Sequence, residues 1–354
     1  MKYLFSLVAF CLLCTVVFAQ GTYSMSGTVT DTTGARIQSA TVFIASTEKM
    51  TSTNADGIFT FTGLKSGNYL VVVNMLGYES VKQAVTINDH DETLHLMIHD
   101  KKNILKEVVV GAKKQSPKDL KKFTKFFLGH SYDPEQCKIL NPELINFGHT
   151  DTTLTATSDD FLIIENKILG YRVKYLLKSF YCRSNGFHFF DGDYSFEPLT
   201  GTAEQQRLWD RNRKVAYQGS SMHFLRSLYA GTTRKEGFLV YRSTTDKALI
   251  LEPNPSDPQQ FVTRSDSSTI SVNIMPMVLI VHDKEKAAKP DVISNKKPKK
   301  YTFGFGLPAR FTLYKLVAKI DSRGSIANFT FVYDFGYWGI FGVANQLPFE
   351  YSPD

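Results

Sequence analysis

The feature that most constrains the fold is a series of short alternating segments between residues 21 and 100. Polar and apolar residues alternate over strand-length runs, and turn signals separate these runs at short intervals. The Asp56-Gly57 pair is a strong hairpin signal, because glycine supplies the positive φ that a tight turn requires. Several short strands with such breaks predict a β-sandwich. Alternation directs these side chains to its inner face: Val42, Ile44, Phe59, Phe61, Val71 and Val73.

The order of the motifs makes this region resemble the carboxypeptidase-regulatory-like domain. The residues that support the resemblance are Gly27-x-Val29-x-Asp31-x-x-Gly34, Ala40-x-Val42-x-Ile44, Thr53-Asn54-x-Asp56-Gly57-x-Phe59-x-Phe61, Gly67-x-Tyr69 and Gly77-Tyr78. The resemblance implies a transthyretin-like sandwich of about seven strands. It also implies a non-catalytic, accessory role for this domain, which we expect to span residues 20–112.

The amino terminus has the pattern of a secretory signal peptide over residues 1–19. Lys2 gives the positive start, an apolar run follows, and Val17-Phe18-Ala19 predicts cleavage before Gln20. The run is short for a membrane anchor, and Cys11 and Cys14 lack the context of a lipoprotein. We therefore expect an exported protein, located in the periplasm or at the outer membrane or cell surface.

Two cysteines remain after removal of the signal, Cys137 and Cys182. Export permits a disulfide between them. A buried free thiol is also common, because cysteine packs as a small apolar residue. The sequence leaves both alternatives open.

The chain is basic, with 41 Lys+Arg against 34 Asp+Glu, and the excess gathers in two segments. One lies before Lys125, and the other runs from Asp283 to Lys300. Neither has a motif that reads nucleic acid, and export argues against such a partner, so we predict none. The segments are typical of solvated connectors. Peripheral membrane contact through Lys113 to Lys125 or through Lys284 to Lys300 stays an alternative.

A lysine-rich linker and helix over residues 113–125 is expected to follow the sandwich. Ser116-Pro117 has the pattern of a helix start, and Leu120, Phe123 and Phe127 follow at helical spacing. This apolar stripe favours packing of the helix onto the region that follows.

We expect residues 126–354 to form a β-rich α+β domain with one broken helical section. Helical spacing begins at Thr202, is interrupted at Gly219-Ser220, and resumes to Tyr229. Residues 256–268 and 283–300 have the composition of long loops. Strands are predicted at residues 153–156, 161–164, 171–180, 186–196, 238–241, 270–281, 301–305, 311–320 and 326–333. The overall class is therefore mainly β with α+β character.

Nearly the whole chain resembles exported proteins common in Bacteroidetes that are described only by their regulatory-like domain. The residues involved are Phe127-Leu128-Gly129, Cys137-x-Ile139-x-Asn141-Pro142, Ile164-Glu165-Asn166-x-x-Leu169-Gly170-Tyr171, Trp209-x-x-x-Arg213-x-x-Ala216-Tyr217-x-Gly219-Ser220-x-x-His223-Phe224-Leu225-Arg226-Ser227-Leu228 and Leu347-Pro348. The segment 105–110 is similar to one that follows this domain in TonB-dependent transporters. The resemblance implies an envelope location and no particular reaction.

No catalytic or metal-binding pattern stands out in the sequence, and we predict no cofactor. His282 and Glu285 have zinc-ligand spacing, but His282 is the last histidine, so a downstream third ligand is missing. His90, His95 and His99 are better explained as exposed strand histidines. Ser220 lacks the surroundings of a nucleophile elbow.

The most distinctive candidate binding surface is the broken helical section. Arginine within an otherwise apolar stripe requires an anionic partner, either an internal carboxylate such as Glu165, Asp191 or Asp193, or a ligand. The candidate binding residues are Trp209, Arg213, Tyr217, His223 and Arg226.

Three functions are compatible with this sequence. The leading hypothesis is a non-enzymatic envelope protein that binds protein or glycan at the outer membrane. The 13% aromatic content favours glycan, because Tyr and Trp stack on sugars. The second is a hydrolase with its site near Trp209 to Arg226. The third is an accessory subunit of a TonB-dependent transporter or an export complex.

Overall fold

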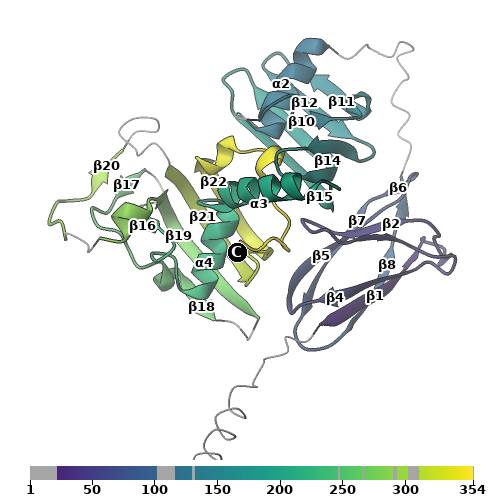
Figure 1. Ribbon diagram of the computed structural model, residues 1–354, viewed down its shortest axis with the longest axis horizontal. Coiled ribbons are helices and arrows are strands. Elements are labelled where there is room, and N and C mark those ends of the chain that lie inside the picture. The colour runs from purple at the N-terminus through teal and green to yellow at the C-terminus, as the bar shows by residue number, and fades with distance from the viewer. Residues whose placement is uncertain are drawn as a thin grey trace, which may run out of the picture.

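A computed structural model describes residues 22–101, 116–129, 132–245, 248–264, 266, 268–289, 293–301 and 311–353. Three sheet-based parts make up the molecule, and α3 crosses between the two larger ones (Figure 1). The expected signal peptide, the segment 105–110 and most of the expected strand 301–305 lie outside the described residues. The predicted mainly β class with α+β character is confirmed.

The amino-terminal part is a sandwich whose two sheets contain seven strands, as predicted. One sheet has the order β4 (Ile58–Leu64), β1 (Tyr23–Thr30), β8 (Glu92–Met97). The other has the order β3 (Met50–Ser52), β2 (Thr41–Ile44), β5 (Gly67–Asn74), β7 (Val81–Ile87). A short pair, β6 (Tyr78–Glu79) with β9 (His99–Asp100), flanks them. Only β1 and β8 pair in parallel among the described strands of this part.

The sandwich core confirms the alternation read from the sequence. All six predicted inward side chains are buried. Gly27 leaves room for its neighbours within the β4–β1–β8 sheet, because a Cβ there would lie 2.7 Å from the Phe59 ring and from the Leu94 carbonyl oxygen. Gly57 adopts φ 67°, as the predicted Asp56-Gly57 turn requires.

A six-stranded antiparallel sheet follows, built on the long strand β14 (Tyr171–Arg183). β15 (His188–Pro198) pairs along one edge of β14. β13 (Leu162–Asn166) and β12 (Thr153–Ser158) share the other edge. The outer strands β10 (Cys137–Ile139) and β11 (Ile145–His149) were not predicted, since each is short and lacks a clear alternating pattern.

The helix α2 (Pro117–Leu128) covers one face of this sheet. Ser116 caps it by accepting a hydrogen bond from the Asp119 amide. Phe123 and Phe127 are fully buried and stack on each other at 4.8 Å. The predicted packing of the apolar stripe is therefore present, and Lys118, Lys121 and Lys125 are exposed on the solvent side of the helix.

Of the two alternatives for Cys137 and Cys182, the structure shows buried free thiols and no disulfide between them. Cys137 pairs with Asn166, which pairs with Tyr171 at the start of β14. Cys182 lies near the opposite end of that strand, roughly 35 Å away at about 3.3 Å per residue. A disulfide requires Cα atoms within about 7 Å.

The third sheet is built on β19 (Thr269–His282), with β21 (Phe311–Asp321) and β22 (Ile326–Gly336) on one side. β16 (Phe238–Arg242) and β18 (Val262–Arg264) share its other edge. The two predicted loops contain short elements: η2 (Pro258–Phe261) and β18 in the first, α5 (Lys284–Ala287) and β20 (Lys299–Lys300) in the second. β20 pairs with β17 (Ile250–Leu251).

The broken helical section joins the two larger sheets. α3 (Ala203–Tyr217) begins at Thr202 with a capping box, and α4 (Ser221–Ala230) begins after the Ser220 cap. The region 126–354 thus has separate cores around the second and third sheets. The carboxy-terminal segment, with η3 (Trp338–Ile340) and η4 (Val343–Asn345), returns to the second sheet, where Ala344 O accepts from Asn166 at 2.8 Å.

The sandwich is joined to the rest by main-chain hydrogen bonds. The turn after β2 lies between β15 and the carboxy-terminal segment. The Ser46 amide donates to Tyr194 O at 2.7 Å, and the Phe196 amide donates to Thr47 O at 2.9 Å. The Phe349 amide donates to Ser46 O at 2.9 Å. The sandwich is therefore fixed to the second sheet and the carboxy-terminal segment by hydrogen bonds as well as by the linker.

Candidate functional site

Trp209, the first residue of the predicted stripe, anchors α3. Its indole N–H donates to Lys167 O at 2.8 Å, and the side chain is buried. Gly170 and Gly201 make room for the ring, because a Cβ on either would approach it within 2.6 Å. The sequence analysis named Trp209 as a candidate ligand-binding residue. In the structure, the described contacts of its ring are with other parts of the chain.

Arg213 is bound by main-chain carbonyls of the turn between β13 and β14. Its Nε donates to Leu169 O at 2.7 Å, and its guanidinium lies 4.2 Å from the centre of the Tyr171 ring. The side chain is 13% exposed and also lies 3.5 Å from Asp210. The carboxylates expected as its internal partners have other neighbours: Asp193 pairs with Lys82 and Lys178, and Glu165 lies near Lys167 and Arg172.

Arg226 links α4 to two distant segments through three carbonyl oxygens. Nε donates to Arg323 O at 2.9 Å, while the terminal nitrogens donate to Tyr351 O at 2.7 Å and Phe349 O at 3.1 Å. The guanidinium lies 5.5 Å from the Tyr217 ring. Burial lowers the pKa of Arg226 from its ordinary value. Arg226 therefore connects α4 to the β21–β22 turn and to the carboxy-terminal segment.

His223 is buried at the start of α4 with its Nδ1 accepting from the Gly219 amide at 3.0 Å. Its Nε2 lies 3.4 Å from a carboxylate oxygen of Glu236. Burial lowers the pKa of His223 to about 4, so the ring is neutral at physiological pH. Ser220 caps the helix, as the Gly219 break suggests, and accepts from the His223 amide at 3.1 Å.

The five predicted residues lie along the joint that α3 and α4 form between the two larger sheets, with Trp209 and Arg213 at the second sheet and Arg226 in contact with the third. Most of their polar atoms bind main-chain groups; the side-chain contacts are those to Asp210 and Glu236 and the hydrogen bond between Tyr217 and Arg226. Such an arrangement orients α3, α4 and the carboxy-terminal segment. A ligand anion at this joint would have to compete with carbonyl oxygens already bound to both arginines.

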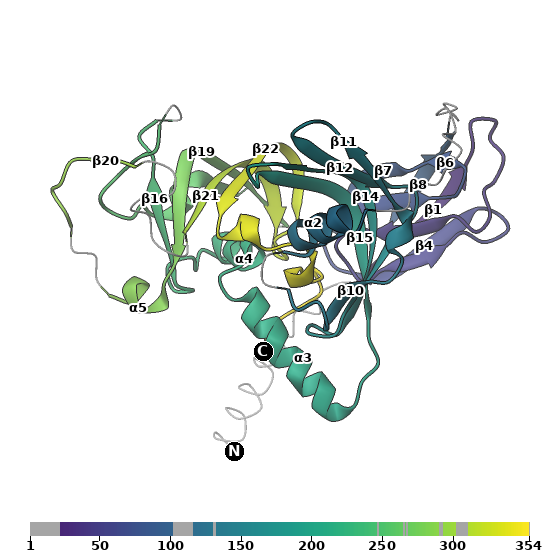
Figure 2. The same ribbon diagram turned by 90° about the horizontal axis from the view of Figure 1, so that it is seen from above.

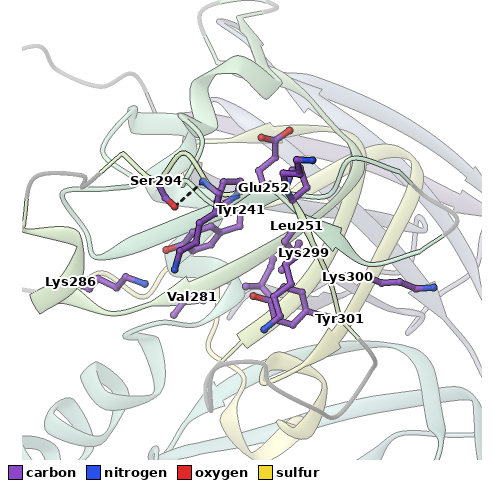
Figure 3. A pocket seen from close by; sticks show the side chains of 14 residues that line it. Tyr241, Leu251, Glu252, Val281, Lys286, Ser294, Lys299, Lys300 and Tyr301 are labelled. Atoms are coloured by element: carbon purple, nitrogen blue, oxygen red, sulfur yellow. Dashed lines mark hydrogen bonds between the residues drawn. The ribbon is translucent and has the colours of Figure 1, made fainter.

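A different feature, a cavity of about 950 Å³, lies on the face of the third sheet that turns away from α4 (Figure 3). Its walls come from β16, β17, β19, α5 and the segment through β20. In Figure 2, α5 and β20 lie at the end of the molecule opposite the sandwich. The cavity is lined by Tyr241, Leu251, Glu252, Pro253, Leu279, Val281, Lys286, Ser294, Lys296, Lys297, Pro298, Lys299, Lys300 and Tyr301.

The floor of the cavity follows from the pleat of β19. Val278 and Ile280 pack into the core beneath α4, whereas Leu279 and Val281 point to the opposite face. Leu251 from β17 joins them in a small apolar cluster. The β17–β20 pair covers part of this cluster and leaves the rest as the cavity floor.

Lysines and tyrosines dominate the rest of the lining. Five lysines lie there, with Glu252 as the carboxylate among the described lining residues. Lys286 Nζ lies 5.5 Å from the centre of the Tyr241 ring, and Lys299 Nζ lies 5.1 Å from that of Tyr301. The basic segment seen in the sequence as a loop therefore forms one wall. The sequence shows that this segment is rich in lysine. It does not show that the segment lies next to Tyr241, because that contact depends on the tertiary structure.

The far end of this wall is held by side-chain hydrogen bonds to the main chain. Asn254 Nδ2 donates to Ser294 O at 3.1 Å, and the Ser294 amide donates to Asn254 Oδ1 at 2.8 Å. This reciprocal pair connects the segment after β17 to the segment before β20. These hydrogen bonds hold this part of the described lining in place.

The lining residues limit which catalytic groups the cavity offers. Its described lining contains neither histidine nor cysteine, and Glu252 is the carboxylate among the described lining residues. In the described part of the chain, no group of three His, Cys, Asp or Glu side chains is placed to hold a metal ion. His90 pairs with Asp89 and Glu92, and His95 lies 3.0 Å from Thr28 Oγ1.

The fold and site define a protein with a β-sandwich module fixed to a β-rich region that holds a basic cavity. Residues 25–110 match the model of the CarboxypepD_reg-like domain, so the sandwich is a domain of this family. No curated protein matches the chain. Across the described residues, no helix is both long and apolar enough to traverse a bilayer.

Solved structures similar to this chain include two pilins and a dioxygenase. The group B streptococcus pilus 2b backbone protein is 21% identical over 23% of this chain and 42% of its own, with a TM-score of 0.21. A streptococcal ancillary pilin is 18% identical over 22% and 32%, with a TM-score of 0.20. Catechol 1,2 dioxygenase from Acinetobacter radioresistens is 11% identical over 25% and 55%, with a TM-score of 0.22. The chain spans less than half of the length of either pilin.

Proposed function

We propose that this chain is a non-enzymatic, exported cell-envelope protein that binds an acidic glycan in the cavity above β19. The observation that supports the proposal most is the gathering of five lysines and two tyrosines over an apolar floor, with Lys286 near the Tyr241 ring and Lys299 near that of Tyr301. A concave site with apolar walls and a few convergent polar groups is typical of ligand binding.

The lining matches the chemistry of a sugar acid. Aromatic rings and the floor formed by Leu279 and Val281 suit the apolar face of a pyranose ring. The lysine ammonium groups suit carboxylate or sulfate groups, and their clustering raises the local concentration of anions. Glu252 among the lysines provides an acceptor for sugar hydroxyls.

In this proposal the sandwich is a fixed support for the binding region. Its turn at Ser46 and Thr47 is hydrogen bonded to Tyr194, Phe196 and Phe349. A docking partner that holds the sandwich would therefore hold the cavity in a defined orientation as well.

The test is binding of polygalacturonate, a polymer of a sugar acid, to the mature chain from Gln20 to Asp354 by titration calorimetry. Neutral dextran is the reference polymer. We expect the Lys299→Glu/Lys300→Glu variant to bind polygalacturonate at least tenfold more weakly, because two attractive charges become repulsive. Tyr241→Ala should weaken binding as well.

Lys319→Glu is the matched control. Lys319 is exposed on the same face of the third sheet, but it lies about 20 Å along β21 from Leu313, the partner of Leu279 in the cavity floor. Equal weakening by all charge changes would mean non-specific attraction and would contradict the proposal. Binding of a protein partner in place of any glycan would do the same.

The envelope location has its own test. Protease treatment of intact cells, followed by fractionation, separates a surface protein from a periplasmic one. Recovery of the untrimmed chain with its first 19 residues in the cytoplasmic fraction would contradict export.

A further inference from the structure

A patch of exposed aromatic side chains lies at the tip of the β14–β15 hairpin. Phe187 is 46% exposed and Phe189 is 51% exposed. Both rings contact Tyr181, with centroids at 6.0 Å and 5.8 Å from it. We call Tyr181, Phe187 and Phe189 the aromatic tip. A contiguous exposed patch of this kind marks an interaction surface more often than isolated apolar residues do.

The aromatic tip is not part of the core under α2. Strand alternation directs Phe180, Cys182 and Phe190 to the buried face, where Phe180 contacts Phe123 and Phe190 contacts Phe127. Tyr181 and Phe189, which are paired across the strands, point to the other face. The tip is therefore on the solvent side of the second sheet.

The tip is also remote from the sandwich. β15 meets the sandwich through Asp193, Tyr194 and Phe196. Phe187 lies about 20 Å from Asp193 at the rise of a strand. The aromatic end of the hairpin thus lies at the end of the second sheet, beside the β11–β12 turn.

Positive charge lies at the same end of the second sheet as the tip. The Arg183 guanidinium lies 5.6 Å from the Phe187 ring. Lys122 of α2 reaches the same end of the sheet, where Nζ donates to Cys182 O at 3.3 Å and to Arg183 O at 3.4 Å. The solvent side of α2 adds Lys118, Lys121 and Lys125, all exposed.

Three carboxylates face this region and leave it net positive. Asp119 of α2 accepts from His149 at 2.9 Å. Asp151 lies in the neighbouring β11–β12 turn, which accepts from the Ser184 amide through Thr152 O at 2.8 Å. Asp191 is exposed on β15. Five cationic side chains therefore meet three anionic ones.

We propose that the aromatic tip and the lysine face of α2 form a peripheral contact with an anionic lipid bilayer. Phe187 and Phe189 enter the boundary between headgroups and acyl chains, and Arg183 with the α2 lysines contacts the headgroups. The combination of aromatic insertion and basic flanks is that of interfacial membrane binding. This surface is separate from the cavity, so the inference goes beyond the proposed glycan binding.

A bilayer suits this surface better than a protein partner does. The patch has three rings at the end of a hairpin, whereas a stable protein interface buries more than about 1,000 Å² on complementary surfaces. A bilayer needs no matching concave surface. Its anionic headgroups also complement the excess of lysine.

The test is cosedimentation of the mature chain with vesicles of phosphatidylglycerol and phosphatidylcholine in equal parts, against vesicles of phosphatidylcholine alone. We expect binding to the anionic vesicles. The Phe187→Ser/Phe189→Ser variant should bind about tenfold more weakly, because both inserting side chains are lost. Leu76→Ser is the matched control, since Leu76 is 84% exposed on the sandwich, and it should bind as the unaltered chain does.

Fluorescence gives a second readout that does not depend on affinity. A Phe189→Trp variant should shift its emission to the blue on addition of the anionic vesicles, as the ring leaves water. The inference is overturned if the unaltered chain does not sediment with these vesicles. It is also overturned if the double serine variant binds equally well, or if the patch captures a protein partner while vesicles leave it unaffected.

Discussion

The Oδ2 atom of Asp321 accepts a hydrogen bond from the Asn68 main-chain amide at 2.9 Å, which connects the third sheet to the sandwich. The same carboxylate accepts from Arg323 at 2.7 Å, and Arg323 donates onward to Asn68 O. The Arg323 guanidinium lies 4.0 Å from the Tyr69 ring. Gly67 permits this approach, because a Cβ there would lie 2.6 Å from Asp321 Oδ2. The sandwich is therefore bound to both larger sheets.

Replacing Asp321 with asparagine should lower the free energy of unfolding by about 3 kcal/mol. The side chain is fully buried and balances Arg323, so the variant leaves a guanidinium beside a neutral amide. Urea denaturation measures the loss. Asp56→Asn, in the exposed hairpin turn of the sandwich, is the control and should change the free energy by less than about 0.5 kcal/mol. A similar small effect at Asp321 would show that the link contributes little.

Loss of Asp193 should weaken the contact between the sandwich and the second sheet. This carboxylate is 3% exposed and lies 2.6 Å from Lys82 Nζ of the sandwich and 3.0 Å from Lys178 Nζ of β14. Asp193→Ala leaves two lysines facing each other. We expect faster hydrogen exchange at the Ser46 and Phe196 amides, which bridge the sandwich and β15. Unchanged protection of these two amides, with normal exchange elsewhere, would contradict this prediction.

Local patterns predicted the strands and helices better than their assembly. The six inward residues of the sandwich, the Ser116 cap and the break at Gly219-Ser220 were all readable, because each depends on neighbours in sequence. Short outer strands such as β10 and β11 were not, since their pairing depends on β13 and β12.

The candidate site shows the same division. The stripe from Trp209 to Arg226 was correctly placed on two helices, but its arginines bind carbonyl oxygens of segments remote in sequence. No sequence pattern reports a carbonyl as a partner. For the cavity, the sequence showed only the lysines after Asp283. Tyr241 is remote from them in sequence and comes near Lys286 because β16 pairs with β19.

The buried thiols should make the protein insensitive to reductant. Burial raises the pKa of Cys137 to about 12 and also raises that of Cys182, so both thiols are protonated and slow to react at neutral pH. We expect dithiothreitol to leave the melting temperature unchanged. Titration with Ellman's reagent should find two thiols in urea and almost none in the folded mature chain. A drop in melting temperature with reductant would indicate a disulfide.

Stability should decrease as the pH falls from about 6.5 to about 4 because of His223. Its pKa is near 6.5 in the unfolded chain and about 4 when folded, since burial opposes the charged ring. Between these values the unfolded chain binds more protons, so the loss reaches up to about 3 kcal/mol. His223→Asn keeps an acceptor for the Gly219 amide and removes the titration, so urea denaturation should show a flatter dependence on pH. The variant at exposed His99, changed in the same way, should keep the original slope; if His223→Asn keeps it too, another group must be responsible.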